Sequence, residues 1–135
     1  DQSVQTLINY GLVIGGYDND LTVEKPVTSH NFMNLLRGSA SRPQTEKAAE
    51  ISEQLQTTYN EIFYKENEPL DLKKASEIVA KILLDEPTHE DSWLSLMEVG
   101  IISKSTFENI DSANHYLIAK EMYAICADVL NFISL

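Results

Sequence analysis

The sequence predicts an all-α fold, a compact bundle of about six helices with a largely buried C-terminal helix. Two observations lead to this prediction. Apolar residues recur at helical spacing along most of the chain, and residues that start or stop helices flank these runs. The 135 residues fit a single helical domain, 1–135, whose core needs no metal or disulfide.

The first predicted helix lies within residues 1–16, where Val4, Leu7, Ile8, Leu12 and Val13 form one stripe and Gly15-Gly16 ends it. Residues 17–28 are rich in turn formers. Within them Leu21-Thr22-Val23 could pair back on Leu12-Val13-Ile14 as a short β-hairpin.

Cap and stop residues predict the next helices. Ser29 caps a helix from His30 to Arg37 that Gly38 closes. Ser41 with Gln44 resembles a capping box for a helix that runs to about Tyr64.

Asp71 caps a further helix, which has the most regular helical periodicity in the chain and ends at Pro87. Thr88 and Asp91 start another, which ends near Gly100.

The last predicted helix starts at Asp111 and is apolar on all sides from Tyr116 to Leu135. Such a helix is either the central element of the bundle or has a spare face for a second copy, which would make a homodimer. The single cysteine, Cys126, falls inside this apolar run, so we expect it to be buried and inert. We expect Asp128 to lie on the exposed edge of this helix.

The formal net charge is −11, which favours a soluble acidic surface and argues against nucleic acid and anionic membranes. No apolar run is long enough to span a membrane. No charged segment followed by an apolar run opens the chain, so we expect no signal peptide, although a leader before Asp1 could have been removed. One cysteine gives no support for an oxidising compartment, so we expect a cytoplasmic location.

We find no pattern that indicates catalysis, a cofactor or a metal. His30, His89 and His115 have no His or Cys at ligand spacing, and surface positions are the simpler interpretation. Asp18-Asn19-Asp20 lacks the later Gly and carboxylate of a calcium loop. We therefore expect a protein that is not an enzyme and has no cofactor.

One stretch departs from the acidic composition. Between Lys25 and Thr45 there is no acidic residue, while Lys25, Arg37 and Arg42 are basic. The candidate residues for a partner or an anion are therefore His30, Arg37 and Arg42. The alternative is that the absence of acids is an accident of a short window.

Residues 27–55 resemble the second half of a phage-repressor-type helix-turn-helix domain, with Ser29, Gly38 and Pro43 at the family's characteristic places. The resemblance implies that Ser29, His30 and Asn34 face DNA bases and that Arg37 contacts phosphate. It departs from the family in lacking a full helix just before residue 27.

Residues 56–93 are similar to a tetratricopeptide repeat, because Tyr59 and Trp93 are separated by that repeat's period and Ala75 and Pro87 fall where it prefers Ala and Pro. The resemblance covers one repeat and implies a local helical hairpin.

These observations leave four functional hypotheses. The first is a non-enzymatic interaction module, such as an adaptor, chaperone, immunity or inhibitor protein, that binds another protein of basic character. The alternatives are a DNA-binding regulator that uses residues 29–42 and a tetratricopeptide-like scaffold. An enzyme built from scattered carboxylates would need a cleft that gathers them with raised pKa values.

Overall fold

The computed structural model describes residues 2–12, 24–108, 110 and 112–135. The fold is all-α, as predicted, and this part of the chain holds six α-helices and one 3-10 turn. The proposed hairpin lies, apart from Leu12, outside the described residues. The elements are α1 (Gln2–Asn9), α2 (Ser29–Ser41), α3 (Glu46–Phe63), α4 (Leu72–Leu83), α5 (Ser92–Glu98), η1 (Lys104–Phe107) and α6 (Ala119–Ile133).

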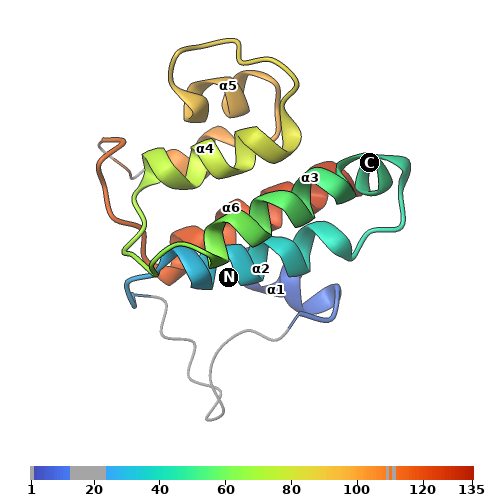
Figure 1. The fold of residues 1–135 in the computed structure, drawn as a ribbon, viewed down its shortest axis with the longest axis horizontal. Helices are drawn as coiled ribbons and strands as arrows, with labels where there is room; N and C mark the ends of the chain where they lie inside the picture. The colour runs from blue at the N-terminus through green and yellow to red at the C-terminus, as the bar shows by residue number, and fades with distance from the viewer. Residues whose placement is uncertain (1, 13–23, 109, 111) are drawn as a thin grey trace.

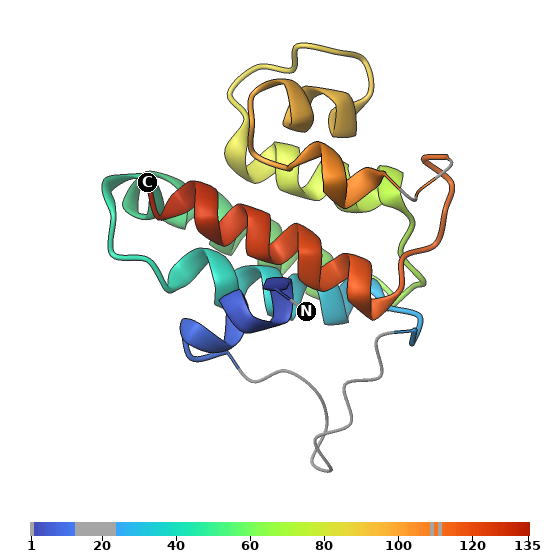
Figure 2. The same cartoon turned by 180° about the vertical axis from the view of Figure 1, so that it is seen from behind.

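The helices pack as neighbouring pairs around one apolar core. α2 lies against α3, α4 against α5, and α1 against α6, while α6 also packs on α2 and α3 on α4 (Figure 1). Seen from behind, α6 crosses the molecule with α1 below it and α4 above it (Figure 2). The buried apolar side chains form one continuous cluster to which every one of these helices contributes.

The largely buried C-terminal helix is confirmed, but it is shorter than expected. α6 begins at Ala119, because residues 115–118 are extended and pair with other segments. Its exposed positions are the polar Lys120 and Asn131. Asp111, the expected cap, is outside the described residues. The buried residues of α6 are Ala119, Met122, Tyr123, Ile125, Cys126, Ala127, Val129, Leu130 and Ile133.

The N-termini of α2, α4 and α6 meet at one place, which we call the N-terminal junction. Each of these helices is preceded by a buried apolar residue, Val27, Leu70 or Leu117, exposed by only 4%, 1% and 1%. Their backbones form a closed ring. Val27 N donates to Leu117 O at 3.2 Å, Leu117 N to Leu70 O at 2.8 Å, and Leu70 N to Val27 O at 3.2 Å. The ring satisfies polar groups that water cannot reach.

A second ring joins the same three segments through the first residue of each helix. Ser29 N donates to Glu68 O, Leu72 N to His115 O and Ala119 N to Lys25 O, at 2.7, 3.0 and 2.8 Å. These amides lack partners inside their own helices, so the bonds complete the helix ends. The junction therefore has approximate threefold symmetry in its hydrogen bonding.

Side chains cap the helices of the junction. In α2, Thr28 rather than Ser29 is the N-cap, and it exchanges hydrogen bonds with Asn31. The predicted Asp71 cap of α4 is confirmed, since its carboxylate accepts from Lys74 N at 2.8 Å. In α6, Glu121 accepts from Ile118 N at 2.9 Å.

Three glycine or cap assignments from the sequence were wrong. Gly38 does not end α2, which continues to Ser41. α1 ends before Gly11, which has a φ of +83° and follows Asn9 by two residues. The expected Ser41–Gln44 box is absent, because Thr45 caps α3 by accepting from Ala48 N at 3.2 Å. Thr45 also donates to Ile133 O at 2.6 Å and so ties α3 to the end of α6.

Asp128 is bonded rather than free at an exposed edge. Its Oδ2 accepts from Ser103 N at 3.0 Å and from the Thr106 hydroxyl at 2.5 Å. The Ser103 hydroxyl donates to the same oxygen at 3.2 Å. The carboxylate thereby fixes the start of η1 against α6.

Candidate functional site

The candidate residues His30 and Arg37 lie at the two ends of one stack of rings, which we call the α2–α3 stack. The Arg37 guanidinium is 4.2 Å from the centroid of the Tyr59 ring. The Tyr59 and Phe63 rings are 4.5 Å apart, and the Phe63 and His30 rings are 4.3 Å apart at an interplanar angle of 12°. His30 and Arg37 share a face of α2, and Tyr59 and Phe63 share a face of α3.

His30 and Tyr59 use polar atoms of their side chains for hydrogen bonds within the fold. His30 Nε2 lies 3.2 Å from Lys65 O, and His30 N donates to Asn67 Oδ1 at 3.0 Å. The Tyr59 hydroxyl donates to Asn34 Oδ1 at 3.3 Å. The stack therefore has a structural role, which is to join α2 to α3.

Arg37 also borders an open hollow of about 450 Å³ between the end of α2 and the first half of α3. Arg37 is the sole charged side chain in its described lining, and most of the others are small or polar. The residues that line it are Arg37, Ala40, Ser41, Pro43, Gln44, Thr45, Ala48, Ala49, Ser52, Leu55 and Gln56.

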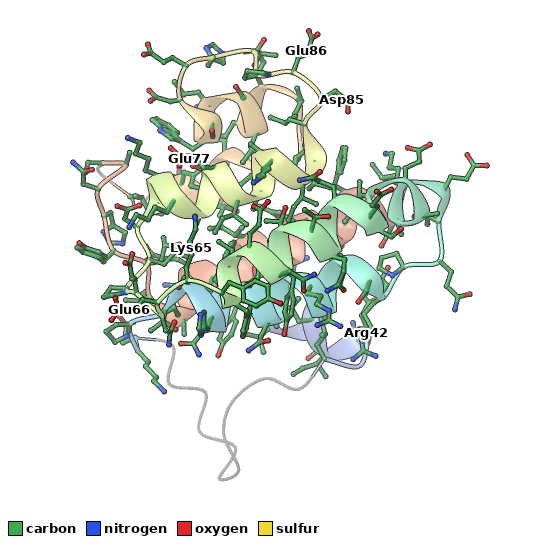
Figure 3. The ribbon with its side chains drawn as sticks, viewed as in Figure 1. Arg42, Lys65, Glu66, Glu77, Asp85 and Glu86 are labelled. Carbon is green, nitrogen blue, oxygen red and sulfur yellow. The ribbon has the colours of Figure 1, made fainter. Side chains whose placement is uncertain are left out.

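Arg42 does not join His30 and Arg37. It directly follows α2, and its Nη1 would lie 3.9 Å from a Cβ placed on Gly11, so it sits beside the end of α1. Figure 3 shows Arg42 at the opposite end of the molecule from Lys65, to whose carbonyl His30 is bonded. The structure thus brings two of the three candidates together and places the third elsewhere.

The residues that carried the helix-turn-helix resemblance occupy other places in the fold. Ser29 is the first residue of α2, and Gly38 is in its interior. Residues 25–28 are engaged in the N-terminal junction, not in a scaffold helix. His30, Asn34 and Arg37 contact residues of α3 or its C-terminal end.

The helical hairpin that the tetratricopeptide resemblance implies is present, since α3 and α4 pack side by side, but Tyr59 and Trp93 do not occupy equivalent places in the fold. Tyr59 lies near the end of α3, whereas Trp93 is the second residue of the short helix α5. α3 and α4 are linked through the extended residues of the junction. The internal repetition that the structure does show is the capped start of α2, α4 and α6.

An acidic lobe, which we define as residues 84–100, lies over α4 on one side of the molecule (Figure 1). It contains no Lys or Arg. Ser95 is completely buried and fixes the loop between α4 and α5. Its hydroxyl accepts hydrogen bonds from Thr88 N at 3.1 Å and from His89 N at 2.9 Å. The acidic residues, all exposed, are Asp85, Glu86, Glu90, Asp91 and Glu98.

Within this lobe only one described carboxylate has a salt-bridge partner. Glu98 contacts His89 Nε2. Asp91 is the N-cap of α5 but its side chain makes no capping hydrogen bond. Figure 3 shows Asp85 and Glu86 projecting from the edge of the lobe. The lobe therefore offers negative charge that the described part of the fold leaves largely uncompensated.

A second hollow, of about 360 Å³, lies between α3 and α4, and we call it the α3–α4 hollow. Two ion pairs lie at its rim: Lys81 bonds to Glu61 across the hollow at 2.5 Å, and Lys74 bonds to Glu68, in the segment before α4, at 3.2 Å. The Lys81 hydrogen bond lowers the pKa of Glu61, and the Glu68 hydrogen bond raises the pKa of Lys74. The lining residues are Ser29, Thr58, Glu61, Ile62, Lys65, Glu66, Glu68, Leu70, Lys74, Glu77, Ile78 and Lys81.

Glu61 does not match a general acid. Such a group needs its carboxyl pKa raised by burial or by a second carboxylate. The pKa of Glu61 moves in the opposite direction, because a lysine stands beside it. Among the described residues, no group of three or more His, Cys, Asp and Glu is placed to hold a metal ion.

The three histidines lie apart, each with an acceptor at its Nε2. His30 faces a backbone carbonyl, His89 faces Glu98, and His115 lies 2.9 Å from Glu121. Cys126 is buried, as predicted, and burial raises the pKa of its thiol. A buried thiol with a raised pKa is a poor nucleophile.

Comparison with known proteins adds no relative. No family model, no curated protein and no solved structure matches this chain. In the part of the chain that the structure describes, the helices are too short or too polar to cross a membrane.

Proposed function

We propose that this chain is a non-enzymatic protein-interaction module that binds a basic partner through the acidic lobe. The observation that carries the proposal is the segregation of charge. Five exposed carboxylates fall within residues 84–100 without a Lys or Arg among them. Carboxylates held on one side of a folded domain raise the local concentration of a cationic partner and speed its association.

The neighbouring apolar residues fit the same role. Val99 is 42% exposed at the end of α5, and Trp93 is half-buried against Phe107 with ring centroids 6.3 Å apart. Interfaces commonly combine an aromatic or apolar centre with a charged rim. We propose a cytoplasmic location for this activity, in keeping with a single cysteine that forms no internal disulfide.

The test compares two charge-neutralised variants for binding to an oligolysine peptide. The lobe variant carries Asp85→Asn, Glu86→Gln, Glu90→Gln and Asp91→Asn. The control variant neutralises the same number of exposed acids elsewhere, with Glu24→Gln, Glu50→Gln, Glu53→Gln and Glu108→Gln. Glu98 is kept in both, because it contacts His89.

Titration calorimetry at low and moderate salt should show binding that weakens as salt rises. The lobe variant should lose about tenfold or more in affinity, and the control variant clearly less. Equal losses in the two variants would mean that total charge, not the lobe, attracts the peptide. Absence of binding to the unmodified chain at low salt would also contradict the proposal.

A homodimer through α6 remains a prediction. The exposed residues of α6 are polar, which favours the central position of this helix over a spare apolar face. Sedimentation velocity over a range of concentrations distinguishes the two.

A further inference from the structure

The two helices that border the α3–α4 hollow carry the same short pattern. Glu61-Ile62 at the end of α3 is followed by Lys65, two residues beyond the helix, and Glu77-Ile78 is followed by Lys81 within α4. Side chains at this spacing share one face of a helix. The helices run in opposite directions side by side (Figure 1). The end of α3 together with the turn after it, and α4, therefore each present a carboxylate, an isoleucine and a lysine to the hollow, in opposite order.

Only one of the two expected cross-pairs is formed. Lys65 stands four residues after Glu61, in the turn that follows α3, and Glu77 stands four residues before Lys81 in α4. Lys81 and Glu61 are bonded at 2.5 Å. Lys65 and Glu77 both line the hollow, on the same side of the molecule in Figure 3, and have no ion-pair partner among the described residues. The hollow thus holds a lysine and a glutamate that form no ion pair with a described residue, although Lys65 is near enough to Glu61 to help lower the pKa of that carboxyl.

The floor between these charges is apolar, with one buried hydroxyl group. It is formed by Ile62, Leu70 and Ile78, with Leu70 1% and Ile78 9% exposed. Thr58 lines the hollow and is 2% exposed. Its hydroxyl accepts from Gln54 Nε2 at 3.2 Å, while no described group accepts its proton. A buried hydroxyl is stabilised when its proton finds an acceptor.

We infer that the α3–α4 hollow binds a small zwitterion with an apolar side chain, of the size of an amino acid or a dipeptide. Its carboxylate would meet Lys65, its ammonium group would meet Glu77, and its side chain would cover the isoleucines. The volume of about 360 Å³ lies at the small end of ligand sites. The narrow apolar floor offers too little area to dock a helix, which needs several hundred square ångströms on each partner.

The probes are L-leucine and two analogues that each lack one charge. 4-Methylpentanoate lacks the ammonium group, and 3-methylbutylamine lacks the carboxylate. Amide chemical shifts recorded during titration report the position as well as the affinity. Because both charged side chains are exposed, we expect millimolar binding of leucine.

Leucine should shift amide signals of residues 58–66 and 74–81 in a saturable manner, with each analogue weaker by about tenfold. Lys65→Met and Glu77→Gln should each weaken leucine binding by about the same factor. The control pair Lys120→Met and Glu50→Gln removes matching charges outside the hollow and should leave binding unchanged.

Three results would overturn the inference. These are no saturable shift up to about 20 mM leucine, equal binding of leucine and its analogues, and full binding by Lys65→Met. A failure here leaves the acidic lobe untouched, because none of the variants changes residues 84–100.

Discussion

Gly38 in the middle of α2 is packed directly beneath Leu12, so closely that a Cβ at this glycine would lie 2.9 Å from Leu12 Cδ2. In an exposed helix, Gly→Ala stabilises by about 1 kcal/mol. Here the gain is opposed by the displacement of a leucine that is itself 9% exposed. The absence of a side chain thus lets the segment that follows α1 lie against α2.

We predict that Gly38→Ala and Leu12→Ala are coupled in a double-mutant cycle. In the Leu12→Ala background, Gly38→Ala should raise the free energy of unfolding by about 1 kcal/mol. In the unmodified chain the same substitution should raise the free energy of unfolding clearly less, or should lower it. Urea denaturation of the four proteins measures both. Additive effects would show that Leu12 does not press on Gly38 in solution.

Asp128 should be important for stability through its contacts with Ser103 and Thr106. Asp128→Ala leaves three donors without their acceptor and should lower the free energy of unfolding by about 1–3 kcal/mol. Asp128→Asn keeps one side-chain oxygen that can accept these hydrogen bonds, so it should lower the free energy of unfolding by less. The same urea experiment measures both, and a neutral Asp128→Ala would mean that water replaces the carboxylate at η1.

The Cys126 thiol should resist modification in the folded protein. Burial raises its pKa, so the folded chain holds less thiolate than a free cysteine at any given pH. At pH 8 a disulfide reagent such as dithionitrobenzoate should react slowly with the native protein and rapidly in urea. Rapid reaction without urea would show that α6 opens readily.

The raised pKa of the Cys126 thiol also predicts how the free energy of unfolding changes with pH in the alkaline range. Above the ordinary cysteine pKa of about 8.5, the unfolded chain loses the thiol proton while the folded chain keeps it. The contribution of Cys126 to stability is therefore complete below that pH and decreases as the pH rises above it. Cys126→Ala removes this contribution, so the variant's unfolding free energy should fall less steeply between pH 8 and 10.

The backbone ring of the N-terminal junction should open as a unit. Val27, Leu70 and Leu117 each donate one bond and accept one, so breaking one bond removes support from the others. Native-state hydrogen exchange should give these three amides similar opening free energies, near the highest in the protein. Exchange of Val27 at the rate of a loop amide would contradict a closed ring.

Much of the fold was predictable from local patterns. The Asp71 cap and the apolar periodicity predicted α4 with nearly its observed bounds. The dense apolar run near the C-terminus predicted that α6 is buried. The start of α6 was not predictable, because Tyr116–Ile118 suits a helix and an extended segment equally well. What decides is pairing with residues 25–28 and 68–71, which are distant in sequence.

Glycines were misassigned for a related reason. Glycine often ends helices, so Gly38 suggested a helix end. Its actual role is to leave room for Leu12, which comes from another segment of the chain. For the candidate site, the stretch without acidic residues drew attention to His30 and Arg37, but nothing in it indicated that rings from α3 would fill the space between them. The α3–α4 hollow did have a sequence signal, the repeated Glu-Ile-x-x-Lys pattern at 61 and 77.

The closed ring also limits when this protein can fold during its synthesis. Its three members stand at positions 27, 70 and 117, and a ring of three cannot be assembled from two. A nascent chain that has emerged only as far as α5 still has open amides and carbonyls at the start of both α2 and α4. Leu117 must therefore have emerged from the ribosome before the ring can close.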